Sequence, residues 1–294
     1  MKPTRLVAST RHSEREFWTR TLLGRSLSLF PEALRPELSI RFGNTGQWGL
    51  PDVYNGAGEA CPPERNLLFV HDDVFLHDLF LQHHLHQGLQ GADLIGLAGS
   101  RGSDLDQPSW GLGFDDDLKP TGWQKGSRLV LSGAVSHVSR YLEPGLPSSL
   151  APAPQLGVYG AFPAECDLLD GLFLACDSSL FRRSAVRFDE RFRFHLYDLD
   201  FCRTARRHGW RLSTWPVLVS HGSGGNFDTD EFRAAARLYL QKWKEADSKQ
   251  QTASGSGSGS LQAVCCQPSA VGSPQPPRQR TTPSTGTLEA ERAP

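Results

Sequence analysis

The stretch Asn66-Leu-Leu-Phe-Val-His-Asp-Asp-Val74 decides the fold predicted for this chain. Its four consecutive apolar residues, 67–70, have the form of a strand buried on both faces of a parallel sheet. The strand ends directly in His71, Asp72 and Asp73, whose side chains can bind metal ions and protons. Ligands of open α/β sheets bind beyond the carboxyl ends of the strands, so this strand end is predicted to lie in a functional site.

Two strand–helix units precede this strand and predict an α/β domain. Residues 5–10 are short and apolar, and Ser13 with Glu16 three residues later forms a capping box that begins a helix. A second strand over residues 38–42 and a helix over residues 50–60, with a proline in its first turn, follow. This alternation is typical of one half of a nucleotide-binding sheet.

The segment after the acidic strand end is predicted to be partly irregular. Leucines spaced by four indicate a helix over residues 76–89, and residues 92–98 have the pattern of a fourth strand. Residues 99–165 are rich in Gly and Pro and are predicted to form a long lid or binding loop, interrupted by the apolar run 129–135.

Regular structure is predicted to return in the second half of the chain. Residues 167–176 form an apolar strand that Asp170 and Gly171 interrupt, which suggests close approach of the backbone to a ligand. A helix over 196–209 ends at a glycine. A last strand over 210–220 delivers His221 to a strand end like that of His71, and a helix over 230–244 closes the domain.

The composition indicates a folded domain and a flexible tail. Of the 294 residues, 38% are hydrophobic and 10% aromatic, which is low for a chain that is folded throughout. Residues 247–294 contain Ser-Gly repeats, a Pro-rich run and no aromatic residue, so they bury too little apolar surface to offset the entropy of ordering. We therefore predict a domain over residues 1–246 and a disordered tail over residues 247–294.

Charge and hydropathy argue against two classes of partner. The formal net charge of −1 gives no bulk attraction to nucleic acid or to an anionic membrane. No apolar run approaches the roughly 20 residues that span a bilayer, and the N-terminus lacks a signal-peptide core. The six cysteines follow neither metal spacing nor a disulfide framework. We expect a cytoplasmic protein without a transmembrane segment that binds no nucleic acid.

The order of the motifs resembles that of family 2 glycosyltransferases with the GT-A fold, especially the bacterial subgroup of capsule and surface-polysaccharide synthesis. The motifs are the apolar strand with His71-Asp72-Asp73, then Asp170-Gly171, then Phe188-Asp189-Glu190 with Tyr197-Asp198-Leu199-Asp200, and then His221. The resemblance covers residues 5–243. It implies an α/β fold with a single Rossmann-like mixed sheet flanked by helices. Residues 1–98 would form the nucleotide-binding half, and residues 99–246 the acceptor and catalytic half.

The resemblance also implies roles for the metal ligands and the base. Asp73 corresponds to the last carboxylate of the Asp-X-Asp motif, which ties Mn²⁺ or Mg²⁺ to the donor diphosphate. His71 stands where the family has the first Asp of that motif, and His221 falls where a further metal ligand often lies. Asp198 matches the Asp of the Glu-Asp motif, the catalytic base, while Tyr197 replaces the preceding Glu.

The remaining site residues are implied in the same way. The family contacts its nucleotide-diphosphate sugar at positions that match Thr10, Arg11, Asn44, Asn55 and Asp72. Acceptor contacts are implied for Asp170 and Gly171, and the acceptor would be a glycan or a lipid-linked molecule. Such an acceptor is compatible with peripheral contact at the inner face of a membrane.

The chemistry of sugar transfer accounts for these residue types. Departure of a nucleoside diphosphate adds negative charge that a cation between the phosphates stabilises, and oxygen plus imidazole ligands suit Mn²⁺ or Mg²⁺. One carboxylate that takes the proton of the acceptor hydroxyl contributes roughly 10²–10⁴-fold in rate. A single base without a second, nucleophilic carboxylate predicts direct displacement with inversion at the anomeric carbon.

Structural interpretations of the same residues and two other functions stay open. Asp72 and Asp73 can N-cap a following helix, Asp198 can complement a helix dipole, and His221 can be an ordinary loop histidine. Asp200 is interpreted as structural. A metal-dependent phosphohydrolase would use the His-Asp dipeptide, normally on a helix. The third function is a non-catalytic sugar- or nucleotide-binding module.

Overall fold

The strand that the sequence singled out, β3 (Asn66–Val70), is buried along its whole length in a 7-stranded mixed sheet. It pairs in parallel with β1 (Thr4–Ser9) and antiparallel with β13 (Phe173–Asp177). Leu67 and Phe69 pack into one hydrophobic core, and Leu68 and Val70 pack into a second core. Because side chains alternate along a strand, β3 supplies both faces of the sheet.

The computed structural model describes residues 1–102, 106–124, 128–138, 155–223, 225 and 227–255. Residues Met1–Lys249 form one compact unit. Its remaining helices are α1 (Glu14–Arg20), α2 (Leu22–Leu27), η1 (Glu32–Leu34), α3 (Leu50–Glu59), α4 (Leu81–Gly91), α5 (Ser178–Arg183), α6 (Tyr197–Arg207) and α7 (Asp230–Gly255), the last of which runs past the end of this unit. Its remaining strands are β2 (Glu37–Arg41), β4 (Val74–Leu76), β5 (Leu94–Gly96), β6 (Ala98–Arg101), β7 (Leu112–Phe114), β8 (Pro120–Trp123), β9 (Val130–His137), β10 (Gln155–Gly160), β11 (Glu165–Cys166), β12 (Leu168–Leu169), β14 (Leu212–Thr214) and β15 (Val219–His221).

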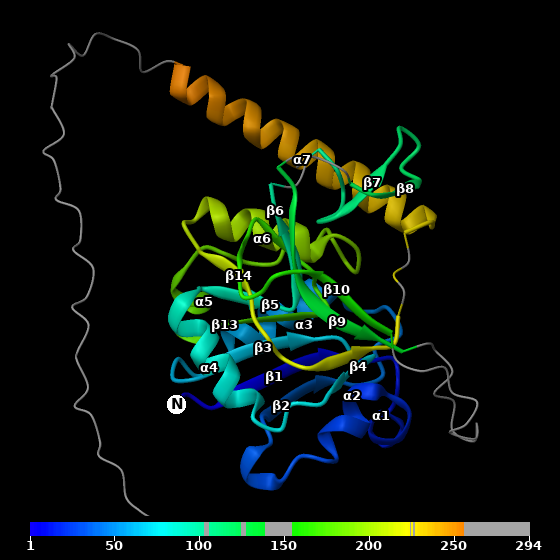
Figure 1. Cartoon of the computed structure of the whole chain (residues 1–294), viewed down its shortest axis with the longest axis vertical. Coiled ribbons are helices and arrows are strands. Elements are labelled where there is room, and N and C mark those ends of the chain that lie inside the picture. The colour runs from blue at the N-terminus through cyan, green and yellow to red at the C-terminus, as the bar shows by residue number, and fades with distance from the viewer. Residues whose placement is uncertain (103–105, 125–127, 139–154, 224, 226, 256–294) are drawn as a thin grey trace, which may run out of the picture. The chain divides into compact units, whose positions relative to one another are not determined.

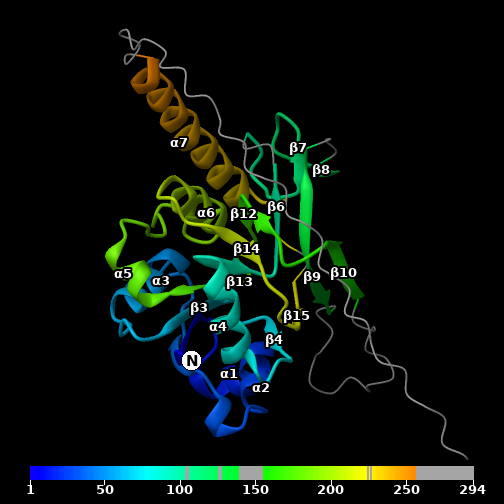
Figure 2. The same cartoon turned by 60° about the vertical axis from the view of Figure 1, so that its left-hand side comes forward.

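The first sheet has the strand order β11-β14-β5-β13-β3-β1-β2 and is covered on both faces (Figure 1). Side chains of α3, α5, α6 and α7 fill the core on one face. Side chains of α1, α2 and α4, together with strands of a second sheet, fill the core on the other. Figure 2 shows the two groups on opposite sides of the molecule. The predicted mixed α/β class is confirmed.

The second sheet has the order β12-β6-β9-β15-β4, with β10 paired to β9. The described chain passes between the two sheets several times, and four of these passages run from β3 to β4, from β5 to β6, from β12 to β13 and from β14 to β15. His71, Asp72 and Asp73 form the first of these passages, and Asp170 and Gly171 lie in the third. The passages therefore bring the predicted site residues to the seam between the sheets.

Several predicted elements are correct. Ser13 and Glu16 form the predicted capping box of α1, and α3 carries a proline in its first turn. Strands occur at β1, β2 and β3, and the 167–176 strand is interrupted at Asp170 and Gly171. Gly209, beyond the end of α6, has a φ of 80°, a left-handed conformation that glycine adopts without strain.

Other predictions were wrong, for identifiable reasons. The single predicted sheet is accompanied by a second sheet and by the two-stranded sheet β7-β8, because the irregular stretch predicted for residues 99–165 contains β6 to β10 in its described part. The helix predicted from residue 76 begins only at Leu81, since residues 74–76 pair with β15. The strand predicted over 210–220 is two short strands in different sheets, with Pro216 between them.

The tail prediction concerns residues that are mostly outside the described ones. Helix α7 continues to Gly255, beyond residue 247 where the tail was predicted to begin. Residues 256–294 lie outside the described part of the chain. Among the helices that are described, none combines the length and the apolar character needed to cross a bilayer.

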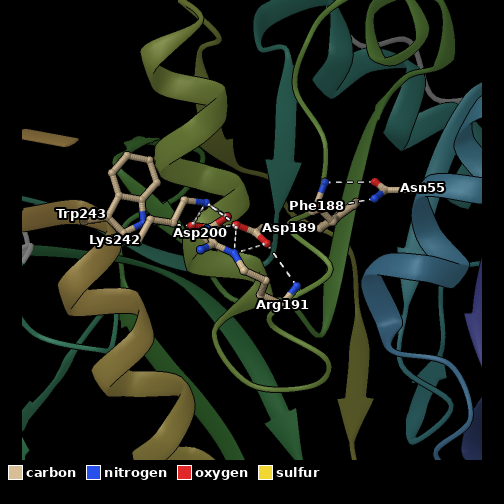
Figure 3. A network of polar contacts seen from close by, with 7 residues as sticks. All are labelled: Asn55, Phe188, Asp189, Arg191, Asp200, Lys242 and Trp243. Carbon is tan, nitrogen blue, oxygen red and sulfur yellow. Dashed lines mark hydrogen bonds and ion pairs between the residues drawn. The ribbon is translucent and has the colours of Figure 1, made fainter. Parts of the chain in front are cut away.

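A buried ion-pair network fixes α7 to α6 and to the loop before it (Figure 3). The carboxylate of Asp200 is fully buried and contacts Lys242 Nζ at 2.6 Å and Trp243 Nε1 at 2.9 Å. The same Lys242 ammonium contacts Asp189 at 2.8 Å, and Asp189 also pairs with Arg191. Buried charges are tolerated only when paired, so this network holds the helices in one arrangement.

Substitution of Lys242 by Met should destabilise the protein by roughly 3–5 kcal/mol, because Asp200 would be left as an uncompensated buried carboxylate. Urea unfolding followed by circular dichroism measures the change. The matched control is Lys244→Met on the same helix, because Lys244 is exposed, and it should shift stability by less than about 0.5 kcal/mol. A similar small effect in both variants would contradict this account of the network.

Candidate functional site

The turn after β3 is held by backbone hydrogen bonds to three other parts of the chain. His71 N–H donates to Leu172 C=O, Leu23 N–H donates to Asp72 C=O, and Gly222 N–H donates to Asp73 C=O, at 2.8–3.1 Å. Asp72 and Asp73 therefore do not begin a helix, because β4 follows them directly. The N-capping interpretation of these two carboxylates is excluded, and their side chains are free for another task.

Three of the predicted metal ligands converge. His71, Asp73 and His221 each offer one ligand atom, and these atoms lie within 4.8 Å of one another. His221 Nε2 is 3.4 Å from Asp73 Oδ1, and His71 Nδ1 is 4.0 Å from the same oxygen. The antiparallel pairing of β15 with β4 places His221 opposite Val74, next to Asp73. We refer to these three residues as the His-Asp-His group.

The His-Asp-His group fits a divalent cation. Asp73 Oδ1 and His221 Nε2 are buried 3.4 Å apart, and among the described residues neither atom forms a well-aligned hydrogen bond. A buried polar atom without a partner is costly, so two of them facing each other indicate a missing third participant. Ligand atoms about 2.1 Å from one metal ion are at most roughly 4.2 Å apart, so both contacts to Asp73 already fall within that limit.

The electrostatics of the group favour a neutral His71 and an ionised Asp73, whereas His221 must give up a proton to bind a metal ion. Burial lowers the pKa of His71, which favours the neutral imidazole that a metal requires. Burial also acts to lower the pKa of His221, but the Asp73 carboxylate outweighs it, so the pKa of His221 is raised. Burial acts to raise the pKa of Asp73, and the two histidines outweigh it, so the pKa of Asp73 is lowered. Asp73 is therefore ionised at neutral pH.

Asp198, at the start of α6, is connected to this group through the backbone of one residue, Gly171. Asp198 Oδ2 accepts a hydrogen bond of 2.8 Å from Gly171 N–H. The Gly171 carbonyl accepts one of 2.9 Å from the Tyr197 hydroxyl, which lies 2.6 Å from His71 Nε2. The predicted base and the predicted metal ligands therefore belong to one continuous set of contacts.

Asp198 has the properties of a general base. Burial, reinforced by the nearby Asp170 carboxylate, raises its pKa to about 7. A base whose pKa lies near the working pH combines a large ionised fraction with strong affinity for a proton. Both oxygens of Asp170 are engaged, Oδ2 by Trp110 Nε1 at 2.9 Å and Oδ1 by Leu172 N–H at 3.0 Å. Asp170 is therefore a fixed charge beside Asp198.

Three of the predicted donor-binding residues meet at the ends of β1, β2 and β3. Asn44 N–H donates to Thr10 C=O at 2.9 Å, and the Asn44 amide nitrogen donates to the Ser9 hydroxyl at 2.9 Å. The Asp72 carboxyl lies by the Thr10 hydroxyl, which acts to lower its pKa, but burial prevails and raises it. Arg11 is exposed next to Thr10. Parallel strands end at the same edge of a sheet, which is why these residues lie together.

Asn55 is not part of this group. It is 8% exposed on α3, and its amide forms two hydrogen bonds with the backbone of Phe188, as Figure 3 shows. Asn55 Nδ2 donates to Phe188 C=O at 2.8 Å, and Asn55 Oδ1 accepts from Phe188 N–H at 3.0 Å. Both ends of the amide are engaged, so the contacts of Asn55 are those of a residue that fixes the loop before α6.

Sequence reasoning missed the second sheet's contribution to the site. Trp110 holds Asp170, and Tyr159 on β10 lies 2.9 Å from His137 Nε2 through its hydroxyl. His137 ends β9, and its ring centroid is 5.9 Å from that of His221. The sequence signal was a histidine at the end of an apolar run, but nothing in the spacing shows that β9 pairs with β15.

A cavity of about 650 Å³ lies away from these residues. Its lining includes Leu79, Phe80, Leu156 and Leu218, together with Ser136 of β9. Because side chains alternate along a strand, Ser136 and its neighbour in the site, His137, point to opposite faces of the second sheet. The cavity contains none of the predicted site residues.

Comparison with known proteins adds little. No protein-family model matches the chain, and no curated protein matches it. Among solved structures, the crystal structure of A197 from STIV is similar, with 10% sequence identity over 72% of this chain and 81% of that chain, at a TM-score of 0.39. A correspondence this loose does not bear on function.

In the metal-free protein, Asp198 should titrate near pH 7, and Asp170→Asn should lower its pKa because a neighbouring negative charge is removed. The pKa should stay above the usual 3.8, since burial, the larger cause, remains. The ¹³C shift of the Asp198 carboxyl carbon measures it. An unchanged pKa in the variant would show that Asp170 does not act on Asp198.

Proposed function

We propose that the chain is an inverting, metal-dependent glycosyltransferase that moves a sugar from a nucleotide-diphosphate donor to a glycan or lipid-linked acceptor. One observation supports this above all. The His-Asp-His group and Asp198 come from β3, β15 and α6, yet one set of contacts through Tyr197 and Gly171 joins them. A cation site beside a base is what transfer from a diphosphate donor requires.

In this proposal the His-Asp-His group holds Mn²⁺ or Mg²⁺. Two imidazoles with one carboxylate favour Mn²⁺, because Mg²⁺ prefers oxygen ligands and keeps several waters. The bound cation would stabilise the charge that develops on the leaving diphosphate. Thr10, Arg11, Asn44 and Asp72 would bind the nucleotide at the adjoining strand ends. Asn55 would act indirectly, through the loop that it holds.

Asp198 would take the proton of the acceptor hydroxyl as that oxygen attacks the anomeric carbon. Asp170 would keep the pKa of Asp198 high, and with Gly171 it would line the acceptor side. Because both Asp170 oxygens already accept hydrogen bonds, it is a poor nucleophile. The bond to the incoming oxygen and the bond to the leaving phosphate would therefore exchange in one step, with inversion.

A phosphohydrolase and an iron-dependent enzyme are two alternatives to a glycosyltransferase. Against a phosphohydrolase, His71 and Asp72 follow a strand rather than lying on a helix, and Asp72 turns toward Thr10. Two histidines with one carboxylate also bind iron(II) in oxygenases, so iron chemistry is the second candidate. It predicts no response to nucleotides, whereas a non-catalytic module predicts binding without transfer.

We also propose a pathway and a location in the cell for this enzyme. The motif order resembles that of capsule and surface-polysaccharide enzymes, so we propose a role in such synthesis, in the cytoplasm or at the inner face of the membrane. A lipid-linked acceptor would bring the protein to that face without a membrane-spanning segment of its own.

A panel of nucleoside diphosphates should raise the melting temperature only when Mn²⁺ is present. A ligand at 100 times its Kd adds about 2.7 kcal/mol of stability to the folded state. His221→Ala should abolish the response by removing one ligand of the His-Asp-His group. The matched control is His83→Ala, because His83 is exposed on α4. A response to Fe²⁺ but to no nucleotide would favour the iron candidate.

Asp198→Asn should lower the rate of sugar transfer by roughly 10²–10⁴-fold while nucleotide binding persists. It should also stabilise the protein above pH 7. The pKa of Asp198 is higher in the folded than in the unfolded state, so its ionisation opposes folding as the pH rises through about 7. Transfer to an acceptor and thermal melts at pH 8 measure the two effects. Retained anomeric configuration in the wild-type product would contradict inversion.

A further inference from the structure

Tyr197 occupies a fixed position between the His-Asp-His group and the loop at Gly171. Its side chain is 2% exposed, and its ring packs against Tyr54 and Phe188 with centroid distances of 5.8 and 5.9 Å. The ring cannot move without disturbing this core, so the hydroxyl is held in place. That hydroxyl lies 2.6 Å from His71 Nε2 and 2.9 Å from the Gly171 carbonyl oxygen, and the Tyr54 hydroxyl is also close to it.

The single proton of this hydroxyl determines the tautomer of His71. A carbonyl oxygen can only accept a hydrogen bond, so the Tyr197 proton must point to Gly171. The hydroxyl oxygen is then an acceptor toward His71, and His71 Nε2 must carry a proton to make the 2.6 Å contact. A metal ion binds the neutral imidazole, which carries only one proton, and here that proton is on Nε2. The other ring nitrogen, Nδ1, then has a free lone pair.

That free nitrogen is the one that faces the His-Asp-His group. Nδ1 lies 4.0 Å from Asp73 Oδ1, on the side where His221 also lies. Metal-binding histidines generally donate their second ring N–H to a neighbouring acceptor, which fixes both the tautomer and the ring orientation. Tyr197 stands in that place for His71.

We propose that Tyr197 is a positioning residue that holds His71 as the Nε2–H tautomer, with Nδ1 presented to the cation. This inference rests on the proposed metal role of His71 and goes beyond it by assigning the orienting group. It also explains a sequence feature, since His71 and Tyr197 stand at the two places where the motifs depart from the carboxylates of the resembled family. A histidine ligand needs a hydrogen-bond acceptor that orients its ring, and the Tyr197 hydroxyl is such an acceptor. A carboxylate at position 197 would also accept the hydrogen bond, but it would add a negative charge to this buried place.

The glycine at position 171 makes this arrangement possible. A Cβ atom built on Gly171 would lie 2.6 Å from the Tyr197 hydroxyl oxygen and 2.7 Å from Asp198 Cβ. Any larger residue would push both side chains away. With glycine at this position, the carbonyl oxygen of Gly171 accepts a hydrogen bond from the Tyr197 hydroxyl, and the N–H of Gly171 donates one to the Asp198 carboxylate.

The test compares Mn²⁺ binding by the wild-type chain and Tyr197→Phe, measured from the loss of the free-Mn²⁺ electron paramagnetic resonance signal. Removing the hydroxyl should weaken Mn²⁺ binding by roughly 10–100-fold, the usual effect of losing the hydrogen-bond partner of a metal-binding histidine. The matched control is Tyr239→Phe, which also removes a buried tyrosine hydroxyl, but on α7, where the ring packs against Trp243. The control should bind Mn²⁺ as the wild type does.

A second measurement needs no variant. The ¹⁵N shifts of His71 in the metal-free wild-type protein should show a protonated Nε2 and an unprotonated Nδ1, and Tyr197→Phe should shift this tautomer balance. An Nδ1–H tautomer in the wild type would overturn the inference even if Tyr197→Phe failed to fold.

The outcomes separate the two proposals. If the wild type binds Mn²⁺, His221→Ala loses it and Tyr197→Phe binds as tightly as the wild type, Tyr197 does not position His71, but the metal site stands. If the wild type binds no Mn²⁺, the metal-dependent function and the role of Tyr197 fall together. If Tyr197→Phe binds Mn²⁺ more weakly than the wild type while the control variant does not, and the wild type shows a protonated Nε2, the positioning role of Tyr197 is supported.

Discussion

The site depends on a constraint at the end of β3, where the chain leaves one sheet for the other. Two buried polar side chains face each other there. Asp73 Oδ1 and His221 Nε2 are buried 3.4 Å apart, and within the part of the chain that the structure describes neither atom forms a well-aligned hydrogen bond. Folded proteins rarely leave such atoms unsatisfied, because each costs about 1–3 kcal/mol. The backbone around them is well bonded, so the deficit lies in the side chains alone. The cation that we propose for this site would supply the missing partner of both atoms.

The parts of this site that the sequence predicted are those that local pattern determines. The apolar run before His71 identifies a buried strand, and parallel strands end at one edge, which is why Thr10, Asn44 and Asp72 meet as expected. For these residues a short segment fixes the place, and the general rule for α/β sheets fixes the rest. His221 and Asp73 were also expected to meet, but the pairing of β15 with β4 in the second sheet brings them together, and the sequence did not indicate that pairing.

What the sequence did not predict depends on pairings between distant segments. The contact between Tyr197 and His71 joins residues 126 positions apart, and no spacing within either segment indicates it. The second sheet was missed because its strands are short, such as β4 with three residues and β12 with two, so periodicity has little to act on. Asn55 was grouped with the donor site by its residue type, whereas the Phe188 backbone engages both ends of its amide.

Asp198 and Asp200 show how surroundings divide like residues into different roles. They lie two positions apart in the first turn of α6, so they point to different sides of the helix. Asp200 points to α7, where Lys242 and Trp243 satisfy its carboxylate and make it a structural anchor. Asp198 points to the seam between the sheets, where its neighbours are a backbone N–H and the like charge of Asp170, so its pKa rises to about 7. Sequence alone places both residues at the start of a helix. The Lys242 ammonium beside Asp200 makes that carboxylate part of the fold, whereas in the described part of the chain no such cation lies beside Asp198, which can accept a proton.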